Sequence, residues 1–432
     1  MGSEEATMNI LVVGSGGREH ALCWKLAQGA HVDHVYAAPG NAGTAGEPGV
    51  TNVALDVMDF EELARFAKSH DIALTVIGPE APLVGGVVDY FTTQGLACFG
   101  PSQAAAQLEG SKAFTKDFLA RHNIPTGAYA NFTELEPALT YLRAQGAPIV
   151  VKADGLAAGK GVIVAETLAQ AEEAVTDMLS GNAFGEAGCR VVIEEFLAGE
   201  EASFIVIADG DHALPMASSQ DHKRIGEGDT GPNTGGMGAY SPAPVVTPAI
   251  HERIMNEVIN PTLAGMAADG MPYTGFLYAG LMIDEAGNPR VIEFNCRFGD
   301  PETQPIMMRL KSDLDALCSA ALAGRLSETT AEWDDRAALG VVLAASGYPG
   351  SYPKGAVIEG LDQANSDDIK VFHAGTEDRN GVYHTSGGRV LCVTALGPDI
   401  LAAQTSAYVA ADTIDWPGKT LRRDIGWRAI DR

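Results

Sequence analysis

The composition of this chain narrows the function classes before any motif is considered. Its 432 residues include 29 Lys and Arg against 56 Asp and Glu, which gives a formal net charge of −27. Such acidity argues against general binding to nucleic acid or to an anionic membrane, because both partners need a positive surface. No run of about 18 apolar residues and no secretion signal is visible, so we expect a soluble cytoplasmic protein. The six cysteines form no CxxC pair, which argues against a disulfide framework or a zinc site.

The first region alternates short apolar runs with helical patterns. Alternating β and α elements predict a parallel sheet covered by helices on both faces. Strands are predicted near residues 9–13, 34–37, 73–77 and 96–99, with helices at 17–28 and 60–69.

A glycine-rich turn joins the first predicted strand to the first helix. Gly14, Gly16 and Gly17 let the backbone approach an anion, and the helix N-terminus offers free N–H groups. The turn departs from GxGxxG because Glu19 takes the sixth position, and no acidic residue for a ribose follows the next strand. A small phosphate-bearing ligand is therefore favoured over a dinucleotide, and a tight turn without any ligand is the alternative.

The second region is a compact β-rich unit. It has a predicted helix at 112–122 and strands at 148–152, 161–165 and 191–196. Thr167 and Gln170 form a capping box that opens a further helix. The small residues between Lys152 and the next strand predict a loop that folds over a triphosphate, with Lys152 as a point charge for its phosphates. An exposed hairpin with two surface lysines is the alternative.

Acidic residues follow the last strand of this unit. The stretch from Glu194 through Glu195 to Leu197 can offer backbone groups to an adenine ring, and Glu201 can accept from ribose hydroxyls. A solvated acidic loop is the alternative.

The third region is predicted to contain strands near 203–208, 276–283 and 290–295. Residues 225–240 are rich in Gly, Pro and Asn, which indicates a long ordered loop of the kind that tends to be functional. Short strands near 339–344, 369–373 and 390–394 predict a smaller final domain.

The strand at 290–295 carries the sharpest local signal. Side chains alternate along a strand, so Glu293 and Asn295 share one face while Ile292 and Phe294 point to the other. A carboxylate and an amide oxygen side by side suit a hard cation such as Mg²⁺. The polar outer face of an amphipathic strand is the alternative.

Together, the order of motifs resembles the phosphoribosylamine–glycine ligase family, also called glycinamide ribonucleotide synthetase, of the ATP-grasp superfamily. The resemblance covers nearly the whole chain. Its motifs are GSGGREHA from Gly14, APGNAG from Ala38, GPEAPL from Gly78, the lysine loop after Lys152, QDHKR from Gln220, PNTGGMG from Pro232 and EFNCRFGDPE from Glu293.

This resemblance implies a multidomain α/β and α+β protein. It would have an ATP-grasp fold, an N-terminal parallel α/β domain and a small C-terminal β-rich domain. The implied parts are the N-terminal domain at 1–108, the small lobe with the glycine-rich loop at 109–199, the large lobe with the metal site at 200–332 and the C-terminal domain at 333–432.

The family's reaction joins glycine to 5-phosphoribosylamine through a glycyl phosphate, forming glycinamide ribonucleotide, ADP and phosphate in purine biosynthesis. The resemblance thus implies ATP as co-substrate, Mg²⁺ or Mn²⁺, and glycine and 5-phosphoribosylamine as small-molecule substrates. No nucleic acid or membrane partner is implied. We expect a monomer, with a weak dimer as the alternative.

The resemblance also implies roles for particular residues. The catalytic residues are Arg297, Asp221 and Lys152, and the metal ligands are Glu293 and Asn295. ATP is bound by Lys112, Lys152, Gly159, Lys160, Gly161, Glu194, Glu195, Leu197 and Glu201. The other substrates are bound by Gly16, Gly17, Arg18, Asn41, Glu80, Asp221, Lys223, Arg297, Ser386, Gly387 and Arg389. One departure is that Leu281 is placed where many ATP-grasp enzymes carry a further acidic metal ligand, which predicts fewer protein ligands here.

Other functions remain as competing hypotheses. A purine-pathway carboxylase acting on aminoimidazole ribonucleotide would use bicarbonate rather than glycine. An NAD-dependent oxidoreductase is suggested only by the glycine turn, and a nucleotide-sensing protein without catalysis would release no ADP.

Overall fold

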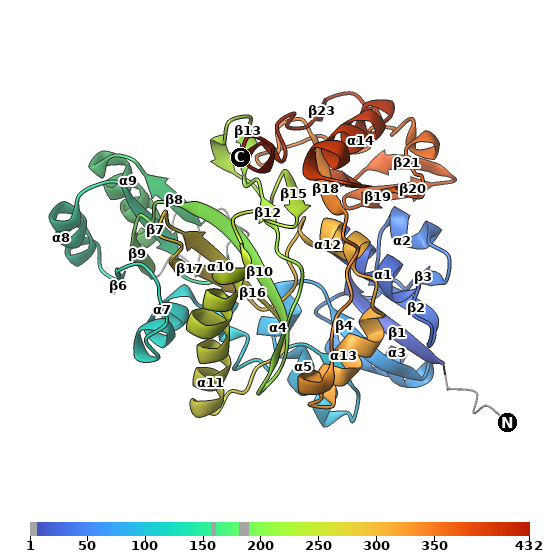
Figure 1. Ribbon diagram of the computed structural model, residues 1–432, viewed down its shortest axis with the longest axis horizontal. Helices are drawn as coiled ribbons and strands as arrows, with labels where there is room; N and C mark the ends of the chain where they lie inside the picture. Colours follow the sequence, from blue (N-terminus) through green and yellow to red (C-terminus); the bar gives the residue numbers. More distant parts are fainter. Residues whose placement is uncertain (1–6, 157–160, 181–189) are drawn as a thin grey trace.

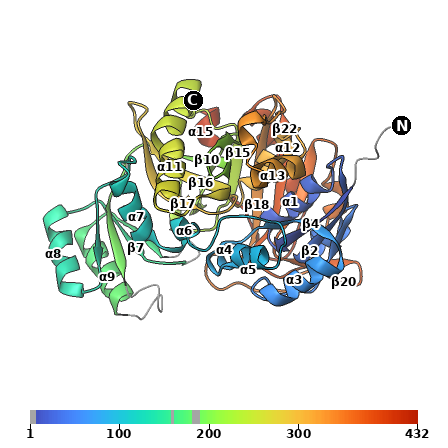
Figure 2. The same cartoon turned by 90° about the horizontal axis from the view of Figure 1, so that it is seen from below.

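The computed structural model describes residues 7–156, 161–180 and 190–432. Figure 1 shows three masses: the N-terminal sheet with the C-terminal region beside it, a central antiparallel sheet, and a small lobe at the opposite end. The view in Figure 2 shows the small lobe standing apart from the rest of the molecule. Within the described ranges, no helix is long and apolar enough to cross a membrane.

The N-terminal sheet is parallel and has the strand order β3-β2-β1-β4-β5. Along β1, Ile10 and Val12 enter the core beneath α1, whereas Leu11 and Val13 enter the core beneath α3. The predicted parallel sheet with helices on both faces is therefore confirmed. The elements are β1 (Met8–Gly14), α1 (Gly17–Leu26), β2 (Val32–Pro39), α2 (Ala42–Gly46), β3 (Val50–Asn52), α3 (Phe60–Ser69), β4 (Ile72–Ile77), α4 (Glu80–Val84), α5 (Val87–Thr93) and β5 (Cys98–Phe99).

The small lobe is an antiparallel sheet of order β6-β9-β7-β8 with α8 and α9 packed against it. The predicted capping box is confirmed: Thr167 Oγ1 accepts from the Gln170 N–H at 3.3 Å, and Gln170 Oε1 accepts from the Thr167 N–H at 3.2 Å. The elements from the linker onward are α6 (Gln107–Gly110), α7 (Lys112–Arg121), β6 (Tyr129–Phe132), α8 (Leu135–Gln145), β7 (Ile149–Ala153), β8 (Val162–Ala165), α9 (Leu168–Leu179) and β9 (Val191–Glu195).

The central sheet has the order β11-β10-β16-β17, and its neighbours run antiparallel. Helical segments at 248–268 cover one of its faces (Figure 1). The elements are β10 (Glu200–Asp209), β11 (Ala213–Pro215), α10 (Pro248–Ile254), a π-helical turn (Met255–Ile259), α11 (Asn260–Ala268), β16 (Thr274–Ile283), β17 (Pro289–Asn295), α12 (Thr303–Arg309) and α13 (Leu314–Leu322).

The expected alternation along β17 is wrong at one residue. Gly280 pairs with Glu293, but Leu281 pairs with Val291, so Ile292 is an extra residue in a bulge. Val291 and Phe294 enter the core, and Ile292 lines the same cavity as Glu293 and Asn295. All residues from Ile292 to Asn295 line the cavity, so the bulge breaks the strict alternation of the two strand faces.

Residues 225–240 are not one long loop, which corrects that expectation. They form a hairpin of β13 (Arg224–Gly226) and β14 (Thr230–Asn233), followed by β15 (Gly238–Ser241). β15 pairs with β18, so a sheet of order β12-β15-β18-β22-β19 joins the region before residue 242 to the C-terminal region. The remaining elements are β12 (Gln220–Asp221), a 3-10 turn (Leu326–Glu328), β18 (Ala337–Ala345), a second 3-10 turn (Leu361–Gln363), β19 (Ile369–His373), β20 (Thr376–Arg379), β21 (Val382–Thr385), β22 (Arg389–Gly397), α14 (Ile400–Thr413), β23 (Lys419–Thr420) and α15 (Trp427–Ile430).

Candidate active site

A cavity of about 660 Å³ lies where the small lobe, the central sheet and the N-terminal region meet. The structure brings most of the predicted site residues to its walls, although they come from segments up to 371 positions apart in the chain. The predicted residues that line it are Arg18, Glu80, Lys112, Lys152, Gly161, Glu194, Glu195, Leu197, Glu201, Asp221, Lys223, Glu293, Asn295, Arg297 and Arg389.

Other predicted site residues lie elsewhere. Asn41 does not line the cavity: its Nδ2 donates to the carbonyls of Ser15 and His373 at 2.9 and 2.8 Å, and its Oδ1 caps α2. Its hydrogen bonds thus hold the N-terminal turn to the C-terminal region. Gly16, Gly17, Ser386 and Gly387 are also absent from the cavity wall, while Gly159 and Lys160 lie outside the described residues.

One end of the cavity, which we call the lysine end, is formed by Lys112, Lys116 and Lys152. Glu194 bridges two of them, with its oxygens 2.9 Å from Lys152 Nζ and 2.8 Å from Lys116 Nζ. Lys112 Nζ donates to the Gly155 carbonyl at 2.7 Å. Because all three ammonium groups surround one space beside the loop after β7, this end is suited to a polyanion.

Burial changes the ionisation of the lysine end. It lowers the pKa of Lys112, although Glu293 opposes the shift. It also lowers the pKa of Lys116 to about 8, against the attraction of Glu194. Lys116 was not predicted from the sequence, yet it follows Lys112 by four positions on α7. That spacing places both lysines on the same helix face and was a usable signal.

The metal ligands predicted at Glu293 and Asn295 both face the cavity from β17. Burial alone would raise the pKa of Glu293, but Lys223, Lys152, Lys112 and Arg297 lower it to about 2. Lys223 Nζ lies 3.7 Å from Glu293 Oε1 and also pairs with Glu201.

An ionised carboxylate beside an amide oxygen is a donor set that fits Mg²⁺ or Mn²⁺ when phosphates and water complete the shell. The described residues contain no cluster of three or more His, Cys, Asp or Glu that could hold a metal by itself. Leu281 is buried in the core, and Met282 is its neighbour that lines the cavity. Leu281 itself is absent from the cavity lining, and the smaller number of protein ligands for the metal stays a prediction.

The opposite end, which we call the arginine end, is formed by Arg18, Arg297 and Arg389. Arg297 lies 3.4 Å from Glu80 and 3.1 Å from Glu109, and these carboxylates raise its pKa although burial opposes them. Arg297 and Arg18 in turn hold the pKa of Glu80 below its usual range against burial. Glu109 was missed because nothing in its sequence surroundings marks it.

Arg389 ties the arginine end to the loop after β14. Its guanidinium lies 3.0 Å from Asp300 and donates to the carbonyl of Gly235 at 2.7 Å. Asp300 has a pKa below its usual range because Arg389 and Arg18 outweigh the effect of burial. The loop and the C-terminal region thus share one wall of the cavity.

The glycine turn before α1 is not part of the cavity wall, and its role in binding a phosphate stays a prediction. Glu19 fills the turn: its Oε2 accepts from the Gly16 N–H at 2.6 Å, and a Cβ at Gly14 or Gly78 would collide with its side chain. Glycine is needed there because a carboxylate occupies the room. The neighbouring Arg18 side chain, rather than the turn itself, carries positive charge to the cavity.

Two further acids lie near the middle of the cavity. Burial raises the pKa of Asp221 well above its usual range, and Glu302 adds to this while Lys223 opposes it. Glu302 accepts from Ser203 Oγ at 2.9 Å. Asp221 and Lys223 flank His222 on the short segment that starts at β12, and this segment places the Lys223 ammonium beside Glu293.

The fold and this site define a nucleotide-dependent enzyme of ATP-grasp architecture. The sequence matches three domain descriptions: "Phosphoribosylglycinamide synthetase, N domain" over residues 8–109, "ATP-grasp (A) domain" over 110–303 and "C domain" over 338–428. The chain belongs to the phosphoribosylglycinamide synthetase family, which confirms the resemblance seen in the sequence.

Named relatives are similar over the full length. A phosphoribosylamine–glycine ligase of Vibrio cholerae is 68% identical across 98% of this chain and 99% of the relative. The one from Pseudomonas syringae is 67% identical across 98% of each. The crystal structure of the Thermotoga maritima enzyme of that name has 33% identity and a TM-score of 0.82, covering 96% of this chain and 100% of that one.

A biotin carboxylase from Campylobacter jejuni has a TM-score of 0.72 at 14% identity, covering 98% of this chain and 95% of that one. At that identity the likeness shows the fold alone. The predicted ATP-grasp multidomain fold is confirmed.

Proposed function

We propose that this chain joins glycine to 5-phosphoribosylamine with ATP, forming glycinamide ribonucleotide, ADP and phosphate in purine biosynthesis. Family membership and the 68% identity to a phosphoribosylamine–glycine ligase support this assignment. The single structural observation that carries it is the pairing of a lysine end and an arginine end within one cavity. Such an arrangement binds two phosphate-bearing substrates in one space.

The reaction requires two transfers. A carboxylate oxygen of glycine attacks the γ-phosphorus of ATP, the bond to the β-phosphate oxygen breaks, and glycyl phosphate and ADP form. The amine nitrogen of 5-phosphoribosylamine then attacks the glycyl carbon. A carbon–nitrogen bond forms, the carbon–oxygen bond to phosphate breaks, and the amine loses a proton. No covalent enzyme nucleophile is needed, so catalysis depends on positioning and on neutralising charge.

The lysine end would hold ATP. Lys112 and Lys152 face the phosphates, the stretch from Glu194 to Leu197 lies along the adenine, and Glu201 accepts from the ribose. Glu293 and Asn295 would hold Mg²⁺ or Mn²⁺, which supplies charge neutralisation on the transferring phosphoryl group. The Glu293 carboxylate is suited to this because it stays ionised far below neutral pH.

The arginine end would hold 5-phosphoribosylamine. Arg18 and Arg389 would receive the ribose phosphate, since both line the cavity and their charges act on the same carboxylate, Asp300. The glycyl group would be transferred beside Asp221 and beside Arg297, the residue of the arginine end whose charge acts on Glu293. Arg297 neutralises the developing charge, and Asp221 together with Lys223 orients the reacting groups.

Beyond the site, we infer that the enzyme works as a monomer in the cytoplasm with small-molecule partners only. The high negative charge supports this partner range, because it disfavours nucleic acid and anionic membranes.

ADP release tests the proposal. The purified chain with MgATP is given glycine alone, 5-phosphoribosylamine alone, both together, or bicarbonate with aminoimidazole ribonucleotide. We expect sustained ADP release only with glycine and 5-phosphoribosylamine together. Release with the bicarbonate pair would identify a carboxylase, and no release under any condition would reject the ligase assignment.

A further inference from the structure

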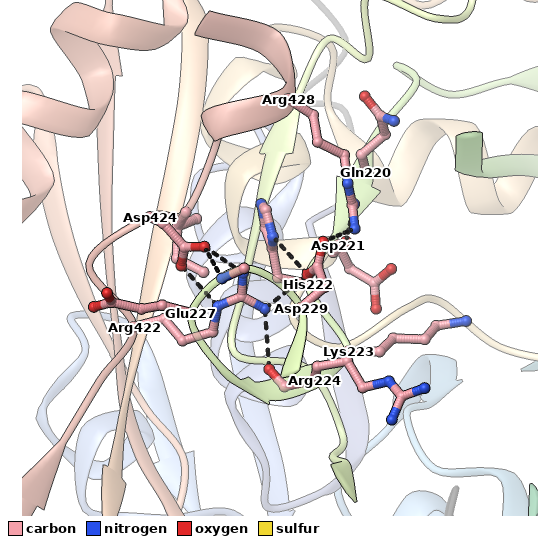
Figure 3. Close-up of polar contacts among 12 residues, drawn as sticks. Gln220, Asp221, His222, Lys223, Arg224, Glu227, Asp229, Arg422, Asp424 and Arg428 are labelled. Atoms are coloured by element: carbon pink, nitrogen blue, oxygen red, sulfur yellow. Dashed lines mark hydrogen bonds and ion pairs between the residues drawn. The ribbon is translucent and has the colours of Figure 1, made fainter. Parts of the chain in front are cut away.

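The C-terminal segment 422–428 packs directly against the segment that carries Asp221 and Lys223 (Figure 3). The contact is polar on both sides. The β13–β14 hairpin lies between them, and its turn residue Asp229 is held at a φ of 57°. A non-glycine residue in this left-handed region costs free energy, so its surroundings must hold it there.

Asp229 is the centre of the contact. Its Oδ1 lies 2.9 Å from Arg422 Nη1, and its Oδ2 lies 2.5 Å from Arg428 Nη2. His222 Nδ1 is 3.7 Å from Oδ1. Both carboxylate oxygens therefore face arginines of the C-terminal segment, and these cations, together with His222, hold the pKa of Asp229 far below its usual range although burial opposes them.

Arg422 has an exposed fraction of only 1%, and its guanidinium is held in place by Asp424 as well as by Asp229. Asp424 accepts from its guanidinium at 2.8 and 2.7 Å and also accepts from the Gly228 N–H at 2.8 Å. The Gly426 N–H donates to His222 Nε2 at 2.9 Å, so the C-terminal segment also fixes the ring between Asp221 and Lys223. The C-terminal segment therefore forms hydrogen bonds both with the β13–β14 hairpin and with His222, which lies on the segment that contributes to the cavity.

Arg428 reaches the cavity itself. It lines the wall beside Asp221, and its Nη1 donates to the Asp221 carbonyl at 3.4 Å. The segment is anchored without this side chain, because Ile425 is fully buried in the C-terminal core and its carbonyl accepts from Gln404. Removing the Arg428 guanidinium should therefore leave the segment folded, with Asp229 still paired to Arg422, while Asp229 Oδ2 and the Asp221 carbonyl lose their contacts to it.

We propose that Arg428, supported by Arg422 and Asp424, is a positioning residue for the ligase reaction. It acts through Asp229 and the Asp221 backbone to fix Asp221 and Lys223 relative to Glu293. This inference rests on the proposed function, in which Asp221 and Lys223 lie beside the reacting groups. The C-terminal segment thereby completes an active site whose other residues come from the first 302 positions and from Arg389.

The test uses the full chain and compares substitutions within this segment. Arg428→Met removes the contact to Asp229, and Asp424→Asn weakens the support of Arg422 outside the cavity. Arg428→Lys retains the positive charge. Arg423→Met is the matched control, because the Arg423 side chain points to Asp412 and both are half-exposed at 50% and 52%. Steady-state ADP release and thermal unfolding are measured for each.

We expect Arg428→Met to lower kcat by about tenfold to 100-fold, since displacing groups at the reacting centre has effects of this size. The KM for ATP should stay within about twofold of the wild type, because the lysine end is untouched. Asp424→Asn should lower kcat less, Arg428→Lys should recover part of the loss, and Arg423→Met should match the wild type.

Three results would overturn the proposal. If kcat of Arg428→Met stays within twofold of the wild type, the segment does not position the site. If the lower kcat of Arg428→Met is explained by a smaller fraction of folded protein, the role of Arg428 is structural only. The same conclusion holds if the KM for ATP changes by as large a factor as kcat. An inactive wild type would reject the proposed function as well, which distinguishes that failure from a failure of Arg428.

Discussion

The lysine end and the arginine end of the cavity are both cationic, but they are neutralised differently. At the arginine end each guanidinium has a carboxylate partner: Glu19 for Arg18, Glu80 and Glu109 for Arg297, and Asp300 for Arg389. At the lysine end, the ion pairs of the described residues place only Glu194 against Lys116 and Lys152, and Lys112 contacts a carbonyl.

This difference matters for what each end can bind. A guanidinium has five donors in a planar fork, so it can keep a protein carboxylate and still bind a substrate phosphate. The arginine end is therefore fixed before substrate arrives. The lysine end has fewer counter-charges, and burial lowers the pKa of Lys112 and Lys116, so on the proposed assignment the phosphates of ATP would supply the missing negative charge.

The largest effect is expected where the two ends meet. Glu293→Gln should lower kcat by about 100-fold or more while the protein stays folded, because it removes a charged metal ligand. The exposed Glu285→Gln in the turn before β17 is the control and should leave kcat unchanged. ADP release and thermal unfolding measure both variants. Near-normal turnover of Glu293→Gln at ordinary Mg²⁺ would contradict the metal assignment.

The arginine end predicts a selective effect on one substrate. Arg18→Ala should raise the KM for 5-phosphoribosylamine about tenfold, the size expected for one lost charge-assisted hydrogen bond. The KM for ATP should change little, because the contacts of Arg18 are with Glu19 and the Phe298 carbonyl rather than with groups of the lysine end. Arg65→Ala, on the exposed face of α3, is the control. A rise in the KM for ATP instead would show that this end binds the nucleotide.

The lysine end predicts a pH effect that the arginine end lacks. The pKa of Lys116 is lowered from 10.5 to about 8 in the folded protein. As pH rises, Lys116 therefore loses its positive charge at a lower pH in the folded protein than in the unfolded chain. Between these two values the contribution of Lys116 to the free energy of unfolding rises with pH, since the unfolded chain holds the proton longer.

Nucleotide binding should respond in the opposite direction. Raising the pH from about 7 to about 9 should raise the KM for ATP about fivefold through Lys116. Lys116→Met should remove this dependence, and the exposed Lys68→Met should retain it. Initial rates at each pH measure the change. An identical pH profile in Lys116→Met and wild type would show that Lys116 does not serve the nucleotide.

The smallest effect is expected at Ser386. The sequence predicts that it binds substrate, but it does not line the cavity. Ser386→Ala should therefore change the KM for 5-phosphoribosylamine by less than about twofold, as expected for a substitution outside the site. A larger increase would show that the arginine end extends beyond the cavity described here.

A helix or strand could be predicted from the sequence where a local pattern within its own residues is enough to specify it. The buried strand β1, the helix α3 and the capped helix α9 follow from periodicity and from Thr167 and Gln170. The bulge at Ile292 and the pairing of β15 with β18 could not, because register depends on contacts between distant segments.

Placement at the cavity was predicted best where motifs lie on strands that face it, as for Lys152 on β7 and Glu293 on β17. Glu109, Glu302 and Arg428 were missed because only the folded chain brings them there. The phosphate role of the glycine turn stays a prediction, because a turn opened for a ligand and one opened for the Glu19 side chain have the same glycine pattern.

The central claim is that this cavity passes a phosphoryl group from ATP to glycine before the amine attacks. Glycine carrying a heavy oxygen isotope in its carboxylate tests this directly, because one of those oxygens must leave with the phosphate. Mass spectrometry of the inorganic phosphate formed with ATP and 5-phosphoribosylamine should show one labelled oxygen per product molecule. Phosphate without label, formed alongside glycinamide ribonucleotide, would contradict the account.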